Sequence, residues 1–183
     1  MKTARLLLAL LMLPLLAQAK SDPAMEELLG RLESSHWVAE GPKKPERVAY
    51  VFTDMACAYC ARLWVNMQPM VNDPDNTLEV RHIIVGMIHP KRSFTQGAAV
   101  LGARHPANAL ARHESQFQQG GIRPVEPVPA AIRSQIHSNT GLFIHLGLQG
   151  TPTLFYQGRN GKWHSASGVI GERDLREKVF RLQ

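Results

Sequence analysis

The chain lacks the features by which several large classes of protein are recognised. It has no internal repeat and no low-complexity tract, and beyond the first twenty residues no apolar run is long enough to cross a bilayer. Lysine and arginine outnumber aspartate and glutamate by 21 to 15, yet they form no cluster. This composition indicates a mildly basic, solvated surface, so nucleic-acid binding is a poor hypothesis.

The first residues have the pattern of a secretory signal peptide. Lys2 and Arg5 precede an apolar core over residues 6–16, and a small-x-small cleavage site follows at residues 17–19. A membrane anchor is the weaker hypothesis, because a spanning helix needs roughly 20 apolar residues. Removing residues 1–19 from the 183 leaves 164 residues, enough for one domain, and lowers the formal charge from +6 to +4.

Cysteine is scarce, and the only two residues of this type stand together in Cys57-Ala58-Tyr59-Cys60. In an exported protein the simplest interpretation of two cysteines is one structural bridge. A bridge over so short a ring restricts the unfolded chain little, by about 2 kcal/mol in the loop-entropy picture. A close and exposed pair suits thiol–disulfide exchange better than stapling.

Hydrophobic periodicity predicts a chain that alternates between helices and strands. An amphipathic helix is expected over residues 24–38, and a short linker over 41–45 leads to a strand over 47–53. A helix over 57–70 and a nearly continuous apolar strand over 77–88 follow. This strand–helix–strand unit predicts two parallel strands with a right-handed crossover.

The second half of the pattern completes the predicted fold. Three helices are expected over residues 94–104, 106–118 and 130–146, then a hairpin of strands over 153–156 and 162–166, and a closing helix through Leu175, Val179 and Leu182. The order predicts an α/β, thioredoxin-like fold with a helical subdomain inserted at about residues 90–147. We expect residues 20–45 to form an N-terminal helix and linker, and residues 46–183 the catalytic domain.

The cysteine pair follows a predicted strand and begins a predicted helix. At that helix end Cys57 would lie among unsatisfied backbone N–H groups, which lower the pKa of a thiol. Cys60 would lie one turn further in and be more buried. We therefore expect Cys57 to be the nucleophile and Cys60 the resolving thiol. Ala58 and Tyr59 carry no charge, so the acidification of Cys57 is expected to be moderate.

Metal and haem sites fit the pair poorly. A c-type haem site needs histidine directly after the second cysteine, where this chain has Ala61. A zinc site needs two further ligands, and the histidine pairs 82/89 and 105/113 lack the usual tight spacing. His82, inside an apolar strand, is interpreted as a satisfied core residue rather than a partner of the site. We predict neither a metal nor a cofactor.

Thr151-Pro152 is the second informative position. The pair opens the strand that follows the helical insert, beside the expected position of the cysteines. A cis proline there would leave the Thr151 backbone free to pair with an extended substrate segment. The alternative is an ordinary proline at the start of a strand.

Several stretches together resemble the DsbC/DsbG family of periplasmic thiol:disulfide interchange proteins, the DsbG branch most closely. They are residues 35–37, 50–54, 57–60, 85–90 and 150–152. The resemblance implies a periplasmic enzyme with Cys57 as nucleophile, Cys60 as resolving thiol, a Cys57–Cys60 disulfide in the oxidised form, and Thr151, cis Pro152 and Tyr59 at the substrate. It also implies cysteine-containing exported proteins as clients and a membrane thiol-disulfide reductase or oxidase as redox partner.

The resemblance does not extend to the front of the chain. Only residues 20–41 precede the catalytic domain, fewer than the family's N-terminal dimerisation domain needs. The amphipathic helix expected there either pairs with a copy of itself or packs on its own domain, and we expect a monomer because isolated short helices are marginal without tertiary packing. The primary hypothesis is a thiol:disulfide oxidoreductase or isomerase acting on exported proteins. The alternative is a non-catalytic chaperone or binding module that uses apolar surface near Thr151 and Trp64 and has a structural disulfide.

Overall fold

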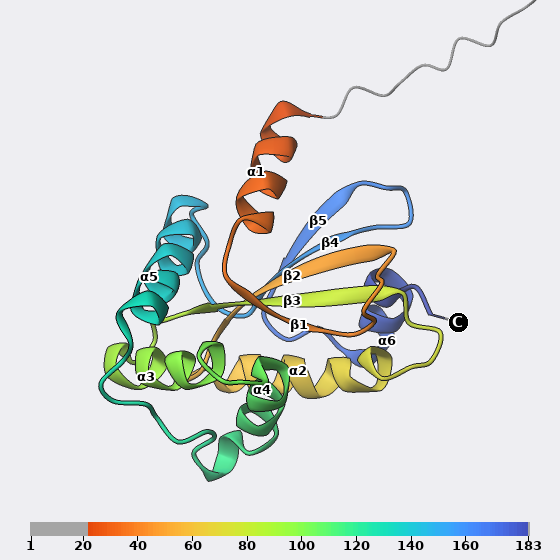
Figure 1. Ribbon diagram of the computed structural model, residues 1–183. Coiled ribbons are helices and arrows are strands. Elements are labelled where there is room, and N and C mark those ends of the chain that lie inside the picture. Colours follow the sequence, from red (N-terminus) through yellow and green to blue (C-terminus); the bar gives the residue numbers. More distant parts are fainter. Residues whose placement is uncertain (1–21, 183) are drawn as a thin grey trace, which may run out of the picture.

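A five-stranded sheet forms the centre of the protein, with helices on both of its faces (Figure 1). The computed structural model describes residues 22–182, and the predicted signal peptide lies outside them. The elements are α1 (Pro23–Glu33), β1 (Trp37–Glu40), β2 (Arg47–Asp54), α2 (Ala58–Val71), β3 (Leu78–Val85), α3 (Pro90–Leu101), α4 (Pro106–Ser115), η1 (Phe117–Gln119), α5 (Ala130–His145), β4 (Thr153–Gln157), β5 (Trp163–Ser167), α6 (Glu172–Asp174) and η2 (Leu175–Phe180). The α/β, thioredoxin-like architecture expected from the sequence is confirmed.

The strand order is β1-β3-β2-β4-β5. β2 and β3 pair in parallel from Arg47 opposite Leu78, as the strand–helix–strand pattern predicts. β4 runs antiparallel to β2 and places Thr153 opposite Phe52. The start of β4 therefore lies beside the end of β2, where the chain enters the loop that carries Cys57.

Side chains alternate between the two faces of β2, and each face has its own core. Ala49 and Val51 face α2 and η2, whose buried residues are Leu63, Met67, Met70, Leu175, Val179 and Phe180. Tyr50 and Phe52 point to the other face, towards α1 and α5, where the Phe52 and Phe143 rings meet edge to face at 5.6 Å. In Figure 1, α2 and α4 lie below the sheet and α1 above it. The sheet is thus held rigidly from both sides.

The helix predicted over residues 24–38 is wrong at its C-terminal end. α1 stops at Glu33, where the hydroxyls of Ser34 and Ser35 donate to the carbonyls of Arg31 and Leu32. These side-chain bonds compete with further helical turns. Residues 37–40 instead form β1, antiparallel to β3, so the sheet begins before the strand that we expected to open the domain.

The closing helix also differs from a regular one. A three-residue turn, α6, leads into η2, a six-residue π-helix with Leu175, Val179 and Phe180 buried. Three helices form the insert, as predicted, and α4 begins with Pro106 in its first turn. Among residues 22–182 no helix has the length and apolar character needed to span a bilayer.

Candidate active site

The N-terminus of α2 holds both cysteines. Cys57 is the N-cap residue, and its Sγ accepts a hydrogen bond from the backbone N–H of Cys60 at 3.2 Å. The backbone N–H of Cys57 donates to the Asp54 carbonyl at 2.9 Å, which closes a tight turn between β2 and α2. Both cysteines are free thiols in this structure. The sulfur of Cys57 therefore lies where the exposed N–H groups of the first helical turn converge.

Thr151 and Pro152 lie directly against Cys57. The Thr151–Pro152 peptide bond is cis, and the Cys57 thiol donates to the Thr151 carbonyl at 3.3 Å. Tyr59 projects from the same end of α2 and is 65% exposed. The structure thus brings together all five residues that the sequence singled out, although Thr151 and Pro152 lie more than ninety positions after Cys60 in the chain.

Cys57 is less accessible than the sequence suggested. Both cysteine residues are only 3% exposed, so the expectation of an exposed pair is wrong. Burial nevertheless affects the two thiols differently. It is the largest influence on the pKa of Cys60 and only the second largest on the pKa of Cys57, which indicates that the Cys60 sulfur lies deeper. Cys57 is followed in the chain by the exposed residues Ala58 and Tyr59.

The surroundings of Cys57 favour its thiolate. Hydrogen bonding from the Cys60 thiol is the largest influence and, with Thr151 and the N–H groups of Tyr59 and Cys60, it lowers the pKa of Cys57 from 9.0 to about 6, against the opposing effect of burial. The Thr151 hydroxyl is buried and has no hydrogen-bond partner among the described residues, so it is available to donate to an ionised sulfur. Cys57 is therefore largely ionised at neutral pH.

The second thiol is held protonated. Burial, first, and then the hydrogen bond and charge of Cys57 raise the pKa of Cys60 well above its ordinary value. Thr53 and the backbone of Asp54 oppose this rise without cancelling it. The two thiols thus have opposite protonation preferences, as expected of a nucleophile and a resolving thiol that share one proton.

Asp54 anchors the loop before the cysteines, and sequence reasoning missed it. Its fully buried carboxylate accepts hydrogen bonds from the backbone N–H groups of Ala56 at 2.8 Å, Met87 at 2.8 Å and Ile88 at 3.0 Å. It therefore ties the loop of Cys57 to the loop after β3. The position of an aspartate directly after a buried strand was the available signal.

Replacing Asp54 by alanine is expected to lower the free energy of unfolding by about 2–4 kcal/mol, because three partly buried N–H groups lose the fully buried carboxylate that accepts their hydrogen bonds. Urea denaturation monitored by tryptophan fluorescence measures the change. Asp75→Ala, at an exposed position in the turn before β3, is the matched control and should change the value by less than about 0.5 kcal/mol. Equal effects of the two substitutions would show that Asp54 is no anchor.

Two consecutive residues of α4, also missed from the sequence, reach the same region. His113 Nε2 lies 2.8 Å from the Met55 carbonyl, and the N–H of Ile122 donates to His113 Nδ1 at 3.1 Å. Nδ1 is thus an acceptor and Nε2 a donor, and burial lowers the pKa of this histidine. Glu114 is only 3% exposed and electrostatically coupled to Cys57. No sequence pattern distinguished either residue from an ordinary helical one.

Trp64 does not contribute to an exposed apolar surface, contrary to the alternative hypothesis. It is 8% exposed, and its indole N–H donates to Glu40 Oε2 at 2.9 Å. His82 Nε2 lies 2.8 Å from the same oxygen, although its ring is not oriented for a hydrogen bond. His82 is thus a core residue, as interpreted from the sequence, but its Nε2 has no hydrogen-bond partner among the described residues, so the expectation that its hydrogen bonding is satisfied is wrong.

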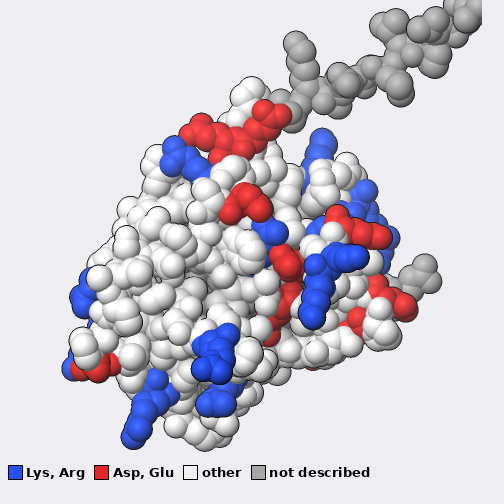
Figure 2. All heavy atoms as spheres, in the orientation of Figure 1, with Lys and Arg blue, Asp and Glu red and all other residues white. Residues whose placement is uncertain are grey.

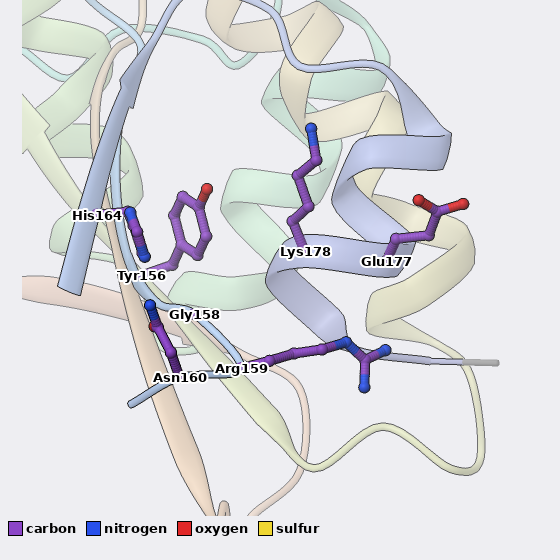
Figure 3. Close-up of a pocket in the computed structure, with 7 residues that line it drawn as sticks. All are labelled: Tyr156, Gly158, Arg159, Asn160, His164, Glu177 and Lys178. Atoms are coloured by element: carbon purple, nitrogen blue, oxygen red, sulfur yellow. The ribbon is translucent and has the colours of Figure 1, made fainter. Parts of the chain in front are cut away.

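A cavity of about 490 Å³ lies away from the cysteines, at the far end of β4 (Figure 3). Tyr156 and His164 form one wall and stack at 5.6 Å, Lys178 projects from η2 on the other side, and Glu177 points away from the opening. Lys178 is already paired with Asp174 at 2.9 Å. Three residues of β4 lie between Pro152 and Tyr156, the nearest lining residue, so this cavity takes no part in the thiol site.

Comparisons with known proteins agree with this geometry. Residues 35–180 match the family described as Thioredoxin-like domain. The chain is 33% identical over 155 residues to the thiol:disulfide interchange protein DsbG of Pseudomonas aeruginosa, covering 85% of this chain and 59% of that protein. It is 30% identical over 157 residues to DsbG of Escherichia coli, covering 84% of this chain and 60% of that protein. The chain therefore spans about three fifths of the length of these relatives.

Solved structures show the same fold at lower identity. The catalytic domain of Proteus mirabilis ScsC superposes with a TM-score of 0.67 and 19% identity, over 84% of this chain and 93% of that one. A periplasmic thioredoxin-like protein from Salmonella enterica serovar Typhimurium gives 0.64 and 19%, over 86% and 94%. The resemblance to DsbG noted in the sequence is confirmed, and the chain belongs to the thioredoxin-like domain family.

Proposed function

We propose that the protein is a thiol:disulfide oxidoreductase that exchanges disulfides with exported, cysteine-containing proteins through Cys57 and Cys60. The observation that carries this proposal is the division of the two pKa values, with Cys57 lowered to about 6 and Cys60 raised. Such a division serves exchange and gives no advantage to a structural bridge. The relatives named as thiol:disulfide interchange proteins support the same activity.

The first step uses the ionised nucleophile. The Cys57 thiolate attacks one sulfur of a client disulfide, so a Cys57–client bond forms, the client S–S bond breaks, and the other client sulfur leaves as a thiolate that takes a proton from solvent. An extended client segment can lie against the backbone of Thr151, whose carbonyl already contacts the attacking sulfur. Exposed Tyr59 borders the same approach.

The second step follows from the influence that the two thiols have on each other. Part of the rise in the pKa of Cys60 comes from the charge and hydrogen bond of Cys57. Once Cys57 is bonded to a client, that charge is gone and Cys60 loses its proton more readily. Cys60 then attacks the mixed disulfide, the Cys57–Cys60 bond forms, and the client leaves with two thiols. The same steps in reverse oxidise a client.

Part of the surface near the site carries no charged side chains. From Ser134 to Gly158 the chain has no lysine, arginine, aspartate or glutamate, and this stretch includes most of α5, Thr151 and β4. Figure 2 shows the uncharged area over α5, and the acidic side chains at the top of the view lie on α1. This uncharged surface sets no charge requirement on a client segment that lies against Thr151 and β4.

We place the protein in the periplasm, delivered by the signal peptide expected over residues 1–19, with a membrane thiol-disulfide reductase or oxidase to restore its redox state. We expect the exported form to act as a monomer. The non-catalytic alternative, with a structural disulfide, loses one of its two supports because Trp64 is buried.

The reduction potential of the Cys57–Cys60 pair distinguishes an oxidoreductase from a binding module with a structural disulfide. We expect a value well above about −300 mV, because a stabilised Cys57 thiolate favours the reduced form of the pair. Equilibration of the protein in glutathione buffers, followed by alkylation of free thiols and mass spectrometry, gives the value. A potential below about −300 mV would mark a structural bridge and support the binding module instead.

A further inference from the structure

A cleft of about 400 Å³ opens directly beside the cysteines, between α2 and the α4–η1 segment of the helical insert. The α2 side is small and apolar at Ala58, Ala61 and Val65, and the exposed Tyr59 and Arg62 side chains stand at the opening. This cleft is separate from the contact of Cys57 with Thr151, which involves the start of β4. It therefore extends the thiol site in a second direction, along the first two turns of α2.

Glu114 supplies the polar group of the cleft. Its side chain lines the cavity, the residue is 3% exposed, and Oε2 is buried with no hydrogen-bond partner among the described residues. Buried polar atoms almost always have a partner, since an unpaired one costs stability. Because the Glu114 side chain lines the cleft, a ligand group bound there can complete the hydrogen bonding of its carboxyl.

The surroundings of Glu114 select the kind of group. Burial, first, and then the charges of Cys57, Glu40 and Asp54 raise the pKa of this carboxyl well above its ordinary value, so the protonated form is favoured. A neutral carboxyl both donates and accepts a hydrogen bond. A primary amide does the same in complementary order, with its N–H to the carboxyl oxygen and its C=O to the carboxyl O–H. Arg62 at the opening disfavours a cationic ligand.

We propose that this cleft is a specificity subsite that binds the side-chain amide of an asparagine or glutamine within two residues of the client's reacting cysteine. The distances fit, because Ala61 is four helical positions from Cys57, or about 6 Å along the axis. Two residues of an extended client span a similar length, at about 3.3–3.6 Å each. The inference rests on the proposed function, since it assigns client selection to the same exchange reaction.

Short peptides test the subsite. Each contains one cysteine joined to thionitrobenzoate, with glutamine, leucine, glutamate or lysine placed in turn one or two positions to either side. The reduced protein attacks the peptide sulfur, the Cys57–peptide bond forms, and the released thionitrobenzoate anion is followed by its absorbance. We expect the glutamine peptide to react about tenfold faster than the leucine peptide in at least one placement, the contribution of a good hydrogen-bonded pair.

Variants assign the preference to the cleft. Glu114→Leu is expected to bring the glutamine-to-leucine rate ratio to about one, and Glu114→Gln, which still pairs with an amide, is expected to keep most of it. Val65→Trp fills the cleft from its exposed side and should also bring the ratio to about one, which preserves the test if Glu114→Leu does not fold. Glu177→Gln, at the distant cavity beside η2, is the control and should retain the wild-type ratio.

The outcomes separate the subsite from the exchange reaction. If the wild-type protein released thionitrobenzoate from every peptide at equal rates, the subsite would be refuted and the oxidoreductase function would stand. A preference for lysine over glutamine would also overturn the assignment, because it requires an ionised Glu114. If no peptide reacted at all, the proposed function itself would fail.

Discussion

Replacing Cys57 by alanine is expected to slow disulfide exchange by at least about a thousandfold, to the background rate. No other thiol of the chain takes its place, because the pKa of Cys60 is raised and its sulfur lies deeper. The reduction of a client disulfide such as that of insulin, followed by turbidity, measures the loss. A Cys57→Ala protein that still turned over a disulfide substrate would refute the assignment of the nucleophile.

Cys60→Ala is the matched variant, and we expect it to trap an intermediate where Cys57→Ala abolishes the reaction. Cys57 can still attack a client disulfide, but nothing resolves the product, so mixed disulfides accumulate at one client per protein chain. Electrophoresis without reductant and mass spectrometry detect them. Loss of the Cys60 hydrogen bond also removes the largest influence that lowers the pKa of Cys57, so the first attack at neutral pH should be slower than in the wild type.

The second large effect is expected in the pH dependence of the reactivity of Cys57 in the reduced protein. With a pKa of about 6, the thiolate fraction of Cys57 rises about ninetyfold between pH 4 and pH 7 and then levels off. An unperturbed thiol at 9.0 would still gain about tenfold per pH unit in that range. The rate of alkylation by iodoacetamide and the ultraviolet absorbance of the thiolate both follow this titration.

The lowered pKa of Cys57 predicts the direction of the pH effect and of a control substitution. Because the folded pKa is lowered, the thiolate is present above about pH 6. The stability that it adds to the reduced protein is complete above pH 9, the ordinary pKa, declines as the pH falls from 9 to 6, and is lost below about 6. Thr151→Val removes the hydroxyl next to the sulfur and should move the midpoint upward. A wild-type midpoint near 9 would mean that α2 and Thr151 do not stabilise the ionised sulfur.

The parts of the fold that the sequence predicted are those that local patterns encode. The periodicities of 3.6 and 2 located the helices and most strands, and the strand–helix–strand order gave the parallel pairing of β2 with β3. β1 was missed because four residues directly after a helix are too few to show a period. Its identity as a strand depends on pairing with β3, some forty positions further along the chain.

In the candidate site, too, the residues that local sequence patterns mark were predicted and the others were not. Cys57, Cys60, Thr151 and Pro152 were found because a short motif and a strand-opening proline mark them in the sequence. Glu114 was not found, because its importance comes from burial against α2, and in the sequence it is one polar residue of an amphipathic helix. The near-complete burial of Cys57 was likewise not predicted, since it depends on a contact with Thr151, more than ninety positions further along the chain.

The helical insert is joined to the loop that carries Cys57. His113 contacts the Met55 carbonyl two positions before Cys57 and is fixed in turn by the backbone of Ile122. A chimera that took α3, α4 and α5 from a relative without an equivalent imidazole would leave that carbonyl unpaired. Grafting experiments should therefore transfer the insert and residues 54–57 as one piece.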